Sequence, residues 1–217
     1  MQDLPMFTTE HGVASLVLRE IPYKATAYIT IQDTQQPQEL LKDCIEFCKA
    51  VGAEKIYAKG HEFLKEYNLH TAIVQMRCPK ANLPKTDCIA EPVTDETIEK
   101  WRTIYNEKMQ PIPNASTMTR VDGEKLVKRG VGYFIYRNDS LLGIGIAHDD
   151  TIEAIAAVKQ GAGADVMLTL CDLLPSNQVV LEVASANLPA RKLYQKLGFL
   201  EISEISRWYD VLTRKNT

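Results

Sequence analysis

The segment Asn187–Phe199, NLPARKLYQKLGF, reads as a short helix carrying one residue that packing does not explain. Pro189 suits the first helical turn, and Gly198 suits the helix end, where a left-handed residue is common. Leucines at helical spacing supply one apolar stripe. Tyr194 lies among them and can donate a proton from its hydroxyl. It is therefore a candidate proton donor; a packed tyrosine with a surface hydroxyl is the alternative.

A glycine-rich segment precedes a second predicted helix. Gly161-Ala162-Gly163 stands between a predicted strand and the apolar-periodic segment 164–174. Backbone N–H groups at a helix N-terminus, left accessible by glycines, bind anions such as a pyrophosphate. Asp165 in the first turn suits the helix dipole but would repel such an anion. A turn that leads into a helix without a ligand is the alternative.

Two residues are candidates to accept a proton. Glu153 lies in the predicted strand 151–158, and strict alternation would place it on one face with Ile155. A carboxylate held among apolar neighbours can act as a base; a solvent-facing strand glutamate is the alternative. His148 is the second candidate, or an ordinary turn residue. No Cys–His or Ser–His–Asp spacing predicts a covalent nucleophile.

The elements that must position these residues follow from hydrophobic periodicity. In the first eighty residues we expect strand, strand, helix, strand, short helix and strand over 12–20, 24–33, 37–53, 54–60, 61–70 and 71–79. From residue 88 we expect strand, helix, helix, hairpin, strand, helix, strand, helix and one or two strands over 88–94, 95–110, 118–130, 132–148, 151–158, 164–174, 178–184, 189–198 and 200–212. Thr94 is the predicted N-cap of the helix at 95–110.

The segment 78–87 has two prolines and no apolar period, which is typical of a linker. It predicts an N-terminal α/β domain over 1–85 and a second domain over 86–217. The segments 63–70 (FLKEYNLH) and 193–200 (LYQKLGFL) can be aligned, but Leu64 then stands where the second has Tyr194. We interpret the first domain as a degenerate half-repeat of the second, without its proton donor or glycine loop; an unrelated α/β extension is the alternative.

Composition bounds the class of protein. The 217 residues are 45% hydrophobic and 24% charged, as in ordinary globular domains. A net charge of −3 argues against nucleic acid as a partner, because phosphate binding normally needs a basic excess. Five cysteines at irregular spacing predict neither a disulfide framework nor a metal site. The absence of a signal pattern and of a membrane-length apolar run predicts a cytoplasmic protein.

From residue 88 onward, over about the last 130 residues, the chain resembles the GNAT superfamily of N-acetyltransferases. Element order agrees, and VVLEVASANLPARKLYQKLGF (179–199) matches the family pattern almost position by position. The resemblance implies the GNAT acyl-CoA N-acyltransferase fold, an α/β (α+β mixed-sheet) class, here with an additional N-terminal α/β domain. One departure is that the family's Gln/Arg position before the glycines falls on Val158.

The resemblance also implies a site. Tyr194 would protonate the departing thiolate, and Glu153 lies where some members place a catalytic glutamate. Asn187 would bond the backbone or the pantetheine arm; a turn-forming asparagine is the alternative. The residues implied to bind the cofactor are Ala157, Val158, Gly161, Ala162, Gly163, Ala164 and Asn187.

The function so predicted is N-acetyl transfer. Acetyl-CoA would be the cosubstrate, with no metal, and a primary amine on a small molecule or peptide would attack it directly in a ternary complex. We expect no nucleic acid and no membrane partner, and a homodimer is compatible with the sequence. Alternatives are a non-catalytic acyl-CoA-binding or sensing module, and an interaction protein whose cofactor groove has closed.

Overall fold

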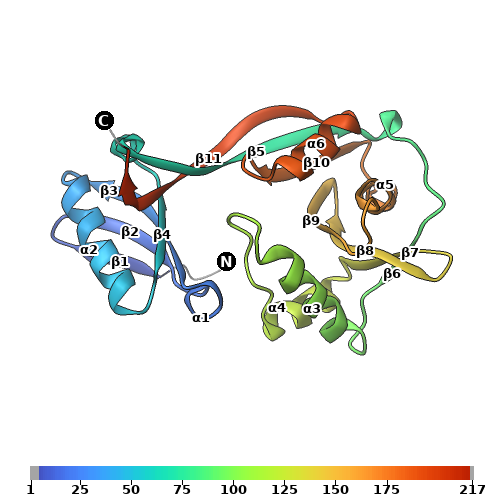
Figure 1. The fold of residues 1–217 in the computed structure, drawn as a ribbon, viewed down its shortest axis with the longest axis horizontal. Coiled ribbons are helices and arrows are strands. Elements are labelled where there is room, and N and C mark those ends of the chain that lie inside the picture. Colours follow the sequence, from blue (N-terminus) through green and yellow to red (C-terminus); the bar gives the residue numbers. More distant parts are fainter. Residues whose placement is uncertain (1–4, 216–217) are drawn as a thin grey trace. The chain divides into compact units, whose positions relative to one another are not determined.

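The computed structural model describes residues 5–215, which form two compact units (Figure 1). Unit 1 comprises residues 5–72 and 206–215, and unit 2 comprises Ile73–Ile205. Strands β5 (Tyr67–Pro79) and β11 (Leu200–Arg214) each contribute residues to both units. The units are defined by packing; the domains 1–85 and 86–217, defined from the sequence pattern, remain a prediction.

Unit 1 is a sheet with one long helix. Its elements are β1 (Met6–Thr9), β2 (Gly12–Val17), α1 (Ile21–Lys24), β3 (Thr26–Thr34), α2 (Pro37–Ala50), β4 (Lys55–Lys59), η1 (Glu62–Glu66) and the unit 1 parts of β5 and β11. The strand order begins β1-β2-β3-β4-β11, and β3 and β4 are parallel. Helix α2 buries Leu40, Leu41 and Cys44 against Ile29 and Ile56 of the sheet. This amphipathic helix and alternating strands therefore bury one continuous core.

Unit 2 carries the residues singled out for chemistry. Its elements are the unit 2 part of β5, η2 (Lys80–Asn82), β6 (Ile89–Pro92), α3 (Ile98–Met109), α4 (Arg120–Arg129), β7 (Gly132–Arg137), β8 (Ser140–His148), β9 (Thr151–Ala157), α5 (Gly163–Leu173), β10 (Gln178–Ala184), α6 (Leu188–Lys196) and the start of β11. The strand order is β5-β10-β9-β8-β7-β6. Residues of α5 and α6 pack in one core and residues of α3 and α4 in another, with strand residues in both cores. The two helix pairs thus cover opposite faces of the sheet (Figure 1).

Most predicted elements are confirmed, with shifted ends. The strand predicted over 12–20 stops at Val17, because Ile21–Lys24 forms a helical turn with Pro22 at its start. The short helix predicted over 61–70 is confined to Glu62–Glu66, and β5 already begins at Tyr67.

Two helix starts differ from expectation. Thr94 is not the N-cap of α3: Ile98 is the first helical residue and Thr97 precedes it. The Thr97 hydroxyl instead accepts the Thr94 N–H at 2.9 Å. Helix α4 begins with a capping box, in which the side chains of Thr119 and Asp122 bond each other's backbone N–H groups. The α4 start is therefore the better-defined helix N-terminus.

No helix within residues 5–215 is long and apolar enough to cross a membrane. Over the same residues, no group of three or more His, Cys, Asp or Glu side chains is arranged to hold a metal ion.

Candidate active site

Strands β9 and β10 part soon after they meet. They are parallel neighbours, but only Thr151 with Val180 and Ile152 with Leu181 are in register. From Glu153 to Ala157 the β9 edge that faces β10 has no ladder partner. At about 3.3 Å per residue this free edge is about 13 Å long. It leads directly to the glycine loop that precedes α5.

A β-bulge lies where the two strands part. Across the β8–β9 pair, Ala147 is opposite Ile152 and Ile146 is opposite Ala154, so Glu153 is an extra residue without a partner. A bulge bends its strand and increases the local twist. The bulge at Glu153 therefore gives a physical reason for β9 to diverge from β10 at this residue.

The bulge also overturns the predicted strand faces. Ile152 and Ile155 pack in the core with α5, whereas Ala154 and Ala156 pack in the core with α3 and α4. Strict alternation had placed Glu153 with Ile155, but the Glu153 carboxylate contacts Arg129 at the end of α4. The prediction was wrong because the extra residue resets the alternation.

Glu153 and His148 form one polar cluster. The Oε2 atom of Glu153 lies 3.3 Å from Nε2 of His148 and 4.0 Å from the Arg129 guanidinium. The other ring nitrogen of His148, Nδ1, lies 3.2 Å from the Asp149 carboxylate. Glu153 is 51% exposed, so it does not lie in the apolar surroundings that the sequence suggested for a base. The structure instead brings the two candidate proton acceptors together.

The loop before α5 has the geometry of an anion cradle. Gly161 has a φ of +83°, and its Cα faces open space. Ala162 is the buried N-cap of α5 and has no side chain that could cap the helix. The backbone N–H groups of the first turn, which begins at Gly163, therefore have no carbonyl one turn earlier to donate to. A Cβ at Gly163 would lie 3.1 Å from Cδ2 of Leu193, so this glycine lets α6 pack closely. Ala164 follows in the first turn, half-buried.

Arg137 pairs with Asp165, the carboxylate in the first turn of α5 that would repel a bound anion. Its guanidinium donates to both oxygens of Asp165, at 3.2 and 2.9 Å, and lies 2.7 Å from the Asp87 carboxylate. Hydrogen bonds to Asp165 first, and then to Asp87, raise the pKa of Arg137 above its usual value. No local pattern predicts this residue, since it belongs to β7, 28 positions before Asp165. Its pairing with Asp165 offsets the negative charge in the first turn of α5.

Tyr194 is almost fully buried on α6. It is 6% exposed and packs in the core with α5, with its ring centroid 6.0 Å from that of Phe199. Burial, and then the nearby Cys171 thiol, raise the pKa of Tyr194 above its ordinary value. Within residues 5–215 its hydroxyl makes no hydrogen bond, and it is not among the fully enclosed unpaired polar atoms. The phenol is thus protonated at neutral pH and its hydroxyl is available to a ligand.

The other predicted cofactor residues lie along the same edge and loop. Val158 donates its N–H to the Leu142 carbonyl of β8 at 2.8 Å, so this donor points away from β10. Because N–H directions alternate along a strand, the N–H of Ala157 points toward β10. Asn187 is the N-cap of α6, and its side-chain oxygen accepts the Ala190 N–H at 3.3 Å. Asn187 therefore forms the turn at the start of α6, as the alternative interpretation of the sequence had it, and its side-chain NH₂ group takes no part in the cap.

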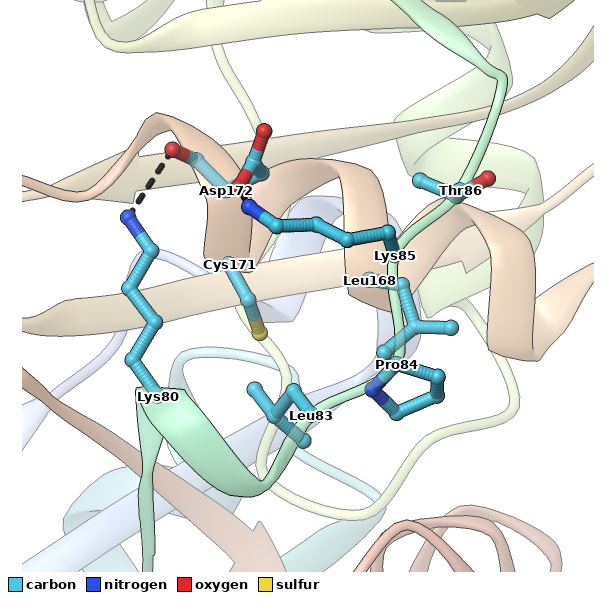
Figure 2. A pocket seen from close by; sticks show the side chains of 8 residues that line it. All are labelled: Lys80, Leu83, Pro84, Lys85, Thr86, Leu168, Cys171 and Asp172. Atoms are coloured by element: carbon cyan, nitrogen blue, oxygen red, sulfur yellow. Dashed lines mark hydrogen bonds and ion pairs between the residues drawn. The ribbon is translucent and has the colours of Figure 1, made fainter.

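A small hollow at the other end of α5 is a different feature. It has a volume of about 20 Å³, enough for about one water molecule, and lies beside Leu83, Leu168 and Cys171 (Figure 2). The Lys80 ammonium donates to the carbonyls of Asp172 and Leu174, at 2.9 and 2.6 Å. These contacts cap the C-terminal carbonyls of α5, so the hollow is a helix-end feature.

Sequence comparisons give no relatives: no protein-family model and no curated protein matches the chain. Solved structures match its fold. A functionally unknown conserved protein from Staphylococcus epidermidis matches with a TM-score of 0.59 at 13% identity, over 96% of this chain and 93% of that one. A putative acetyltransferase from Pyrococcus horikoshii matches with a TM-score of 0.58 at 12% identity, over 95% and 72%.

A GCN5-related N-acetyltransferase from Kribbella flavida matches with a TM-score of 0.54 at 14% identity, over 96% of this chain and 90% of that one. At such identities a structural likeness shows the fold alone. The predicted α/β GNAT fold is confirmed, and the protein has the fold of GNAT acetyltransferases.

Proposed function

We propose that the protein is an acetyl-CoA-dependent N-acetyltransferase acting on a primary amine. The observation that carries the proposal is the free edge of β9, which runs from the bulge at Glu153 into the glycine loop before α5. Unpaired backbone N–H and C=O groups cost free energy unless solvent or a ligand bonds to them. A bound ligand therefore gives a reason for a strand edge that stays unpaired inside the sheet.

The loop suits the pyrophosphate of CoA. Free N–H groups and the positive end of the α5 dipole attract an anion, and Gly161 leaves room for close approach. The bidentate pairing of Asp165 with Arg137 offsets the one negative charge in this first turn. The residues present therefore fit the group that the fold implies.

The pantetheine arm would follow the free edge of β9 toward the bulge. An amide group of the arm can pair with the N–H of Ala157, as a neighbouring strand would. Val158 cannot contribute its N–H, because Leu142 already accepts it. Anchored at the loop, an arm that extends along this edge places its thioester near Glu153.

Acid and base then stand on opposite faces of β9. Tyr194 belongs to the core with α5 and α6, and Glu153 contacts α4 on the other side. We assign Glu153 to accept a proton from the ammonium of the acceptor and Tyr194 to protonate the departing thiolate. Holding amine and thioester in contact supplies most of the acceleration, without a covalent acyl-enzyme. Acetyl-CoA provides the activated acyl group, and the acceptor is a primary amine of a small molecule or peptide.

Calorimetric titration with acetyl-CoA and desulfo-CoA tests the cofactor part. We expect a Kd near or below about 100 μM, equivalent to about 5.5 kcal/mol. Gly161→Asp should weaken binding at least about tenfold, because it adds a carboxylate to the cradle and a side chain at a positive φ.

Gly52→Asp in unit 1 is the matched control. Gly52 also has a positive φ, +97°, and a Cβ there would meet only Cγ2 of Ile21, at an ordinary van der Waals distance of 3.6 Å, so the backbone cost is similar, and CoA affinity should not change. Thiol release from acetyl-CoA is then measured with L-lysine, spermidine, tyramine and an alanyl dipeptide. Binding without turnover of any amine would favour an acyl-CoA-binding module, and no binding at millimolar ligand would overturn the proposal.

A further inference from the structure

The cluster of Glu153, His148 and Asp149 connects the parting of β9 and β10 to the protein surface. Glu153 directly follows Ile152, the last β9 residue paired with β10. Its carboxylate contacts Nε2 of His148, whose Nδ1 contacts Asp149. The three side chains are 51%, 27% and 90% exposed, so the chain of contacts ends at a carboxylate open to water.

The turn geometry fixes this arrangement. Asp149 has a φ of +52°, a left-handed conformation that aspartate tolerates better than most residues. It begins the tight turn between β8 and β9, where His148 stands opposite Thr151. Alternation along β9 places Glu153, two residues after Thr151, on the face on which His148 lies. The bulge changes the faces of the residues that follow, so that Ala154 shares the α3 and α4 side with Glu153 and Ile155 packs on the opposite side.

We propose that Glu153, His148 and Asp149 form a proton exit relay for the transfer reaction, a role that rests on the proposed function. At neutral pH the acceptor is an ammonium, and acetylation converts it and acetyl-CoA into an amide, CoA thiol and one released proton. Glu153 takes a proton from the ammonium and passes it to the free lone pair on Nε2 of His148. The imidazolium then releases the proton on Nδ1 to Asp149 and water. The two carboxylates are then in their starting states, and His148 regains its starting tautomer when its partly exposed ring exchanges the Nε2 proton for one on Nδ1 through solvent.

The charges around the imidazole suit this role. The charged groups facing it are the carboxylates of Glu153 on β9 and Asp149 in the turn. Asp150 is turned to the Thr151 hydroxyl, and Arg129 of α4 lies 4.0 Å from Glu153. When both ring nitrogens carry a proton, each can donate a hydrogen bond to one of these carboxylates.

The test uses the full chain, acetyl-CoA and the amine of the panel above with the highest turnover. We expect His148→Gln to lower kcat at least about tenfold while the Kd for CoA stays within twofold, because glutamine keeps a hydrogen bond but transfers no proton. The activity of His148→Ala should rise with the concentration of added imidazole buffer at constant pH. His61→Ala, at an exposed histidine in unit 1, should show neither effect.

Four outcomes decide against the relay. Unchanged turnover of His148→Gln would overturn it, as would a loss that imidazole does not restore, since a purely structural histidine behaves in that way. Loss in Glu153→Gln with full activity in His148→Gln would leave Glu153 as a base that releases its proton directly to water. A wild-type protein that binds CoA but acetylates no amine would overturn the relay and the transfer reaction together, whereas the cofactor cradle would stand.

Discussion

Two strand–helix–strand segments of the molecule have the same connectivity but differ in how far their parallel strands stay together. In unit 1, β3 and β4 are in register over five residues, from Thr26 with Lys55 to Thr30 with Lys59. In unit 2, β9 and β10 are in register over two. Gly60 shows how closed the first pair is, because a Cβ there would collide with the carbonyl oxygen of Ile31.

A bulge lies at a different position in each of these strands. Both β3 and β9 carry one extra residue against their antiparallel neighbour: Gln32 in β3 and Glu153 in β9. In β9 parallel pairing ends at Ile152, directly before the bulge, whereas in β3 it ends at Thr30, where β4 itself ends at Lys59. The extra residue comes late in β3, after most of the strand is paired, and early in β9. The early bulge in β9 therefore leaves a long strand edge without a ladder partner, whereas the late bulge in β3 leaves the pairing with β4 intact.

The segments that precede α2 and α5 also differ in the backbone N–H groups that they leave free. Helix α2 begins with Pro37, which has no N–H, and its N-cap Gln36 is not a glycine. Helix α5 begins after Gly161 with its first N–H groups free. Only unit 2 offers both a donor-lined loop and an open strand edge. We therefore place the proposed cofactor site in unit 2, where the free edge of β9 leads directly into the loop before α5.

The largest expected effect concerns Tyr194. Tyr194→Phe keeps the buried ring and removes only the hydroxyl, so the Kd for CoA should stay within twofold. General acid catalysis contributes typically 10²- to 10⁴-fold, so kcat should fall about a hundredfold. Steady-state thiol release measures it. Tyr209→Phe, at a buried tyrosine of unit 1, is the matched control and should keep full activity; an unchanged kcat in Tyr194→Phe would remove the proton donor from the mechanism.

Removing the bulge of β9 should lengthen its parallel pairing with β10 toward that of β3 with β4. Deletion of Glu153 leaves Ile152, Ala154, Ile155 and Ala156 on the faces they already occupy, so the core should tolerate it. The straightened strand should pair further with β10 and close the free edge. We expect CoA affinity to fall at least about tenfold, or 1.4 kcal/mol, measured by calorimetry.

Deletion of Gln32, the bulged residue of β3, is the control for this change. It should alter the stability of unit 1 without altering CoA affinity. Equal CoA affinity in the wild type and in the Glu153 deletion would break the link between bulge and cofactor edge.

The comparison also shows what sequence could and could not predict. The strand Gln178–Ala184 and the helices over Gly163–Leu173 and Leu188–Lys196 followed from apolar spacing and from helix-end residues, because those signals are local. Tyr194 and the glycines belong to the same local patterns. The fold could therefore be assigned from these local patterns together with the order of elements after residue 88.

The surroundings of the site could not be predicted in this way. A bulge is a mismatch between two strands, so the residues of β9 alone do not show that Glu153 turns toward His148 and Arg129. Arg137 pairs with Asp165 across 28 positions, with no spacing rule to connect them. Long-range side-chain pairs depend on strand register, and register comes from the assembled sheet.

A smaller effect is expected for Arg137 of β7, which pairs with Asp165 at the start of α5. Arg137→Gln leaves Asp165 uncompensated in the first turn of α5, so CoA should bind about fivefold more weakly at low salt. The double variant Arg137→Gln/Asp165→Asn removes both charges and should recover most of the affinity. If the double variant binds no better than the single one, Arg137 contacts the phosphates itself rather than neutralising Asp165.

The smallest effect should come from Asn187, the N-cap of α6. Its side-chain oxygen caps α6 through the Ala190 N–H, so Asn187→Ala should lower the free energy of unfolding by about 1 kcal/mol in a urea titration. Thr119→Ala, which removes the N-cap of α4, should cost a similar amount. Because the oxygen of Asn187 is already engaged, we expect CoA affinity to change less than twofold in both variants. A tenfold loss confined to Asn187→Ala would instead show that its free NH₂ group holds the pantetheine arm, and would extend the cofactor edge from β9 to the start of α6.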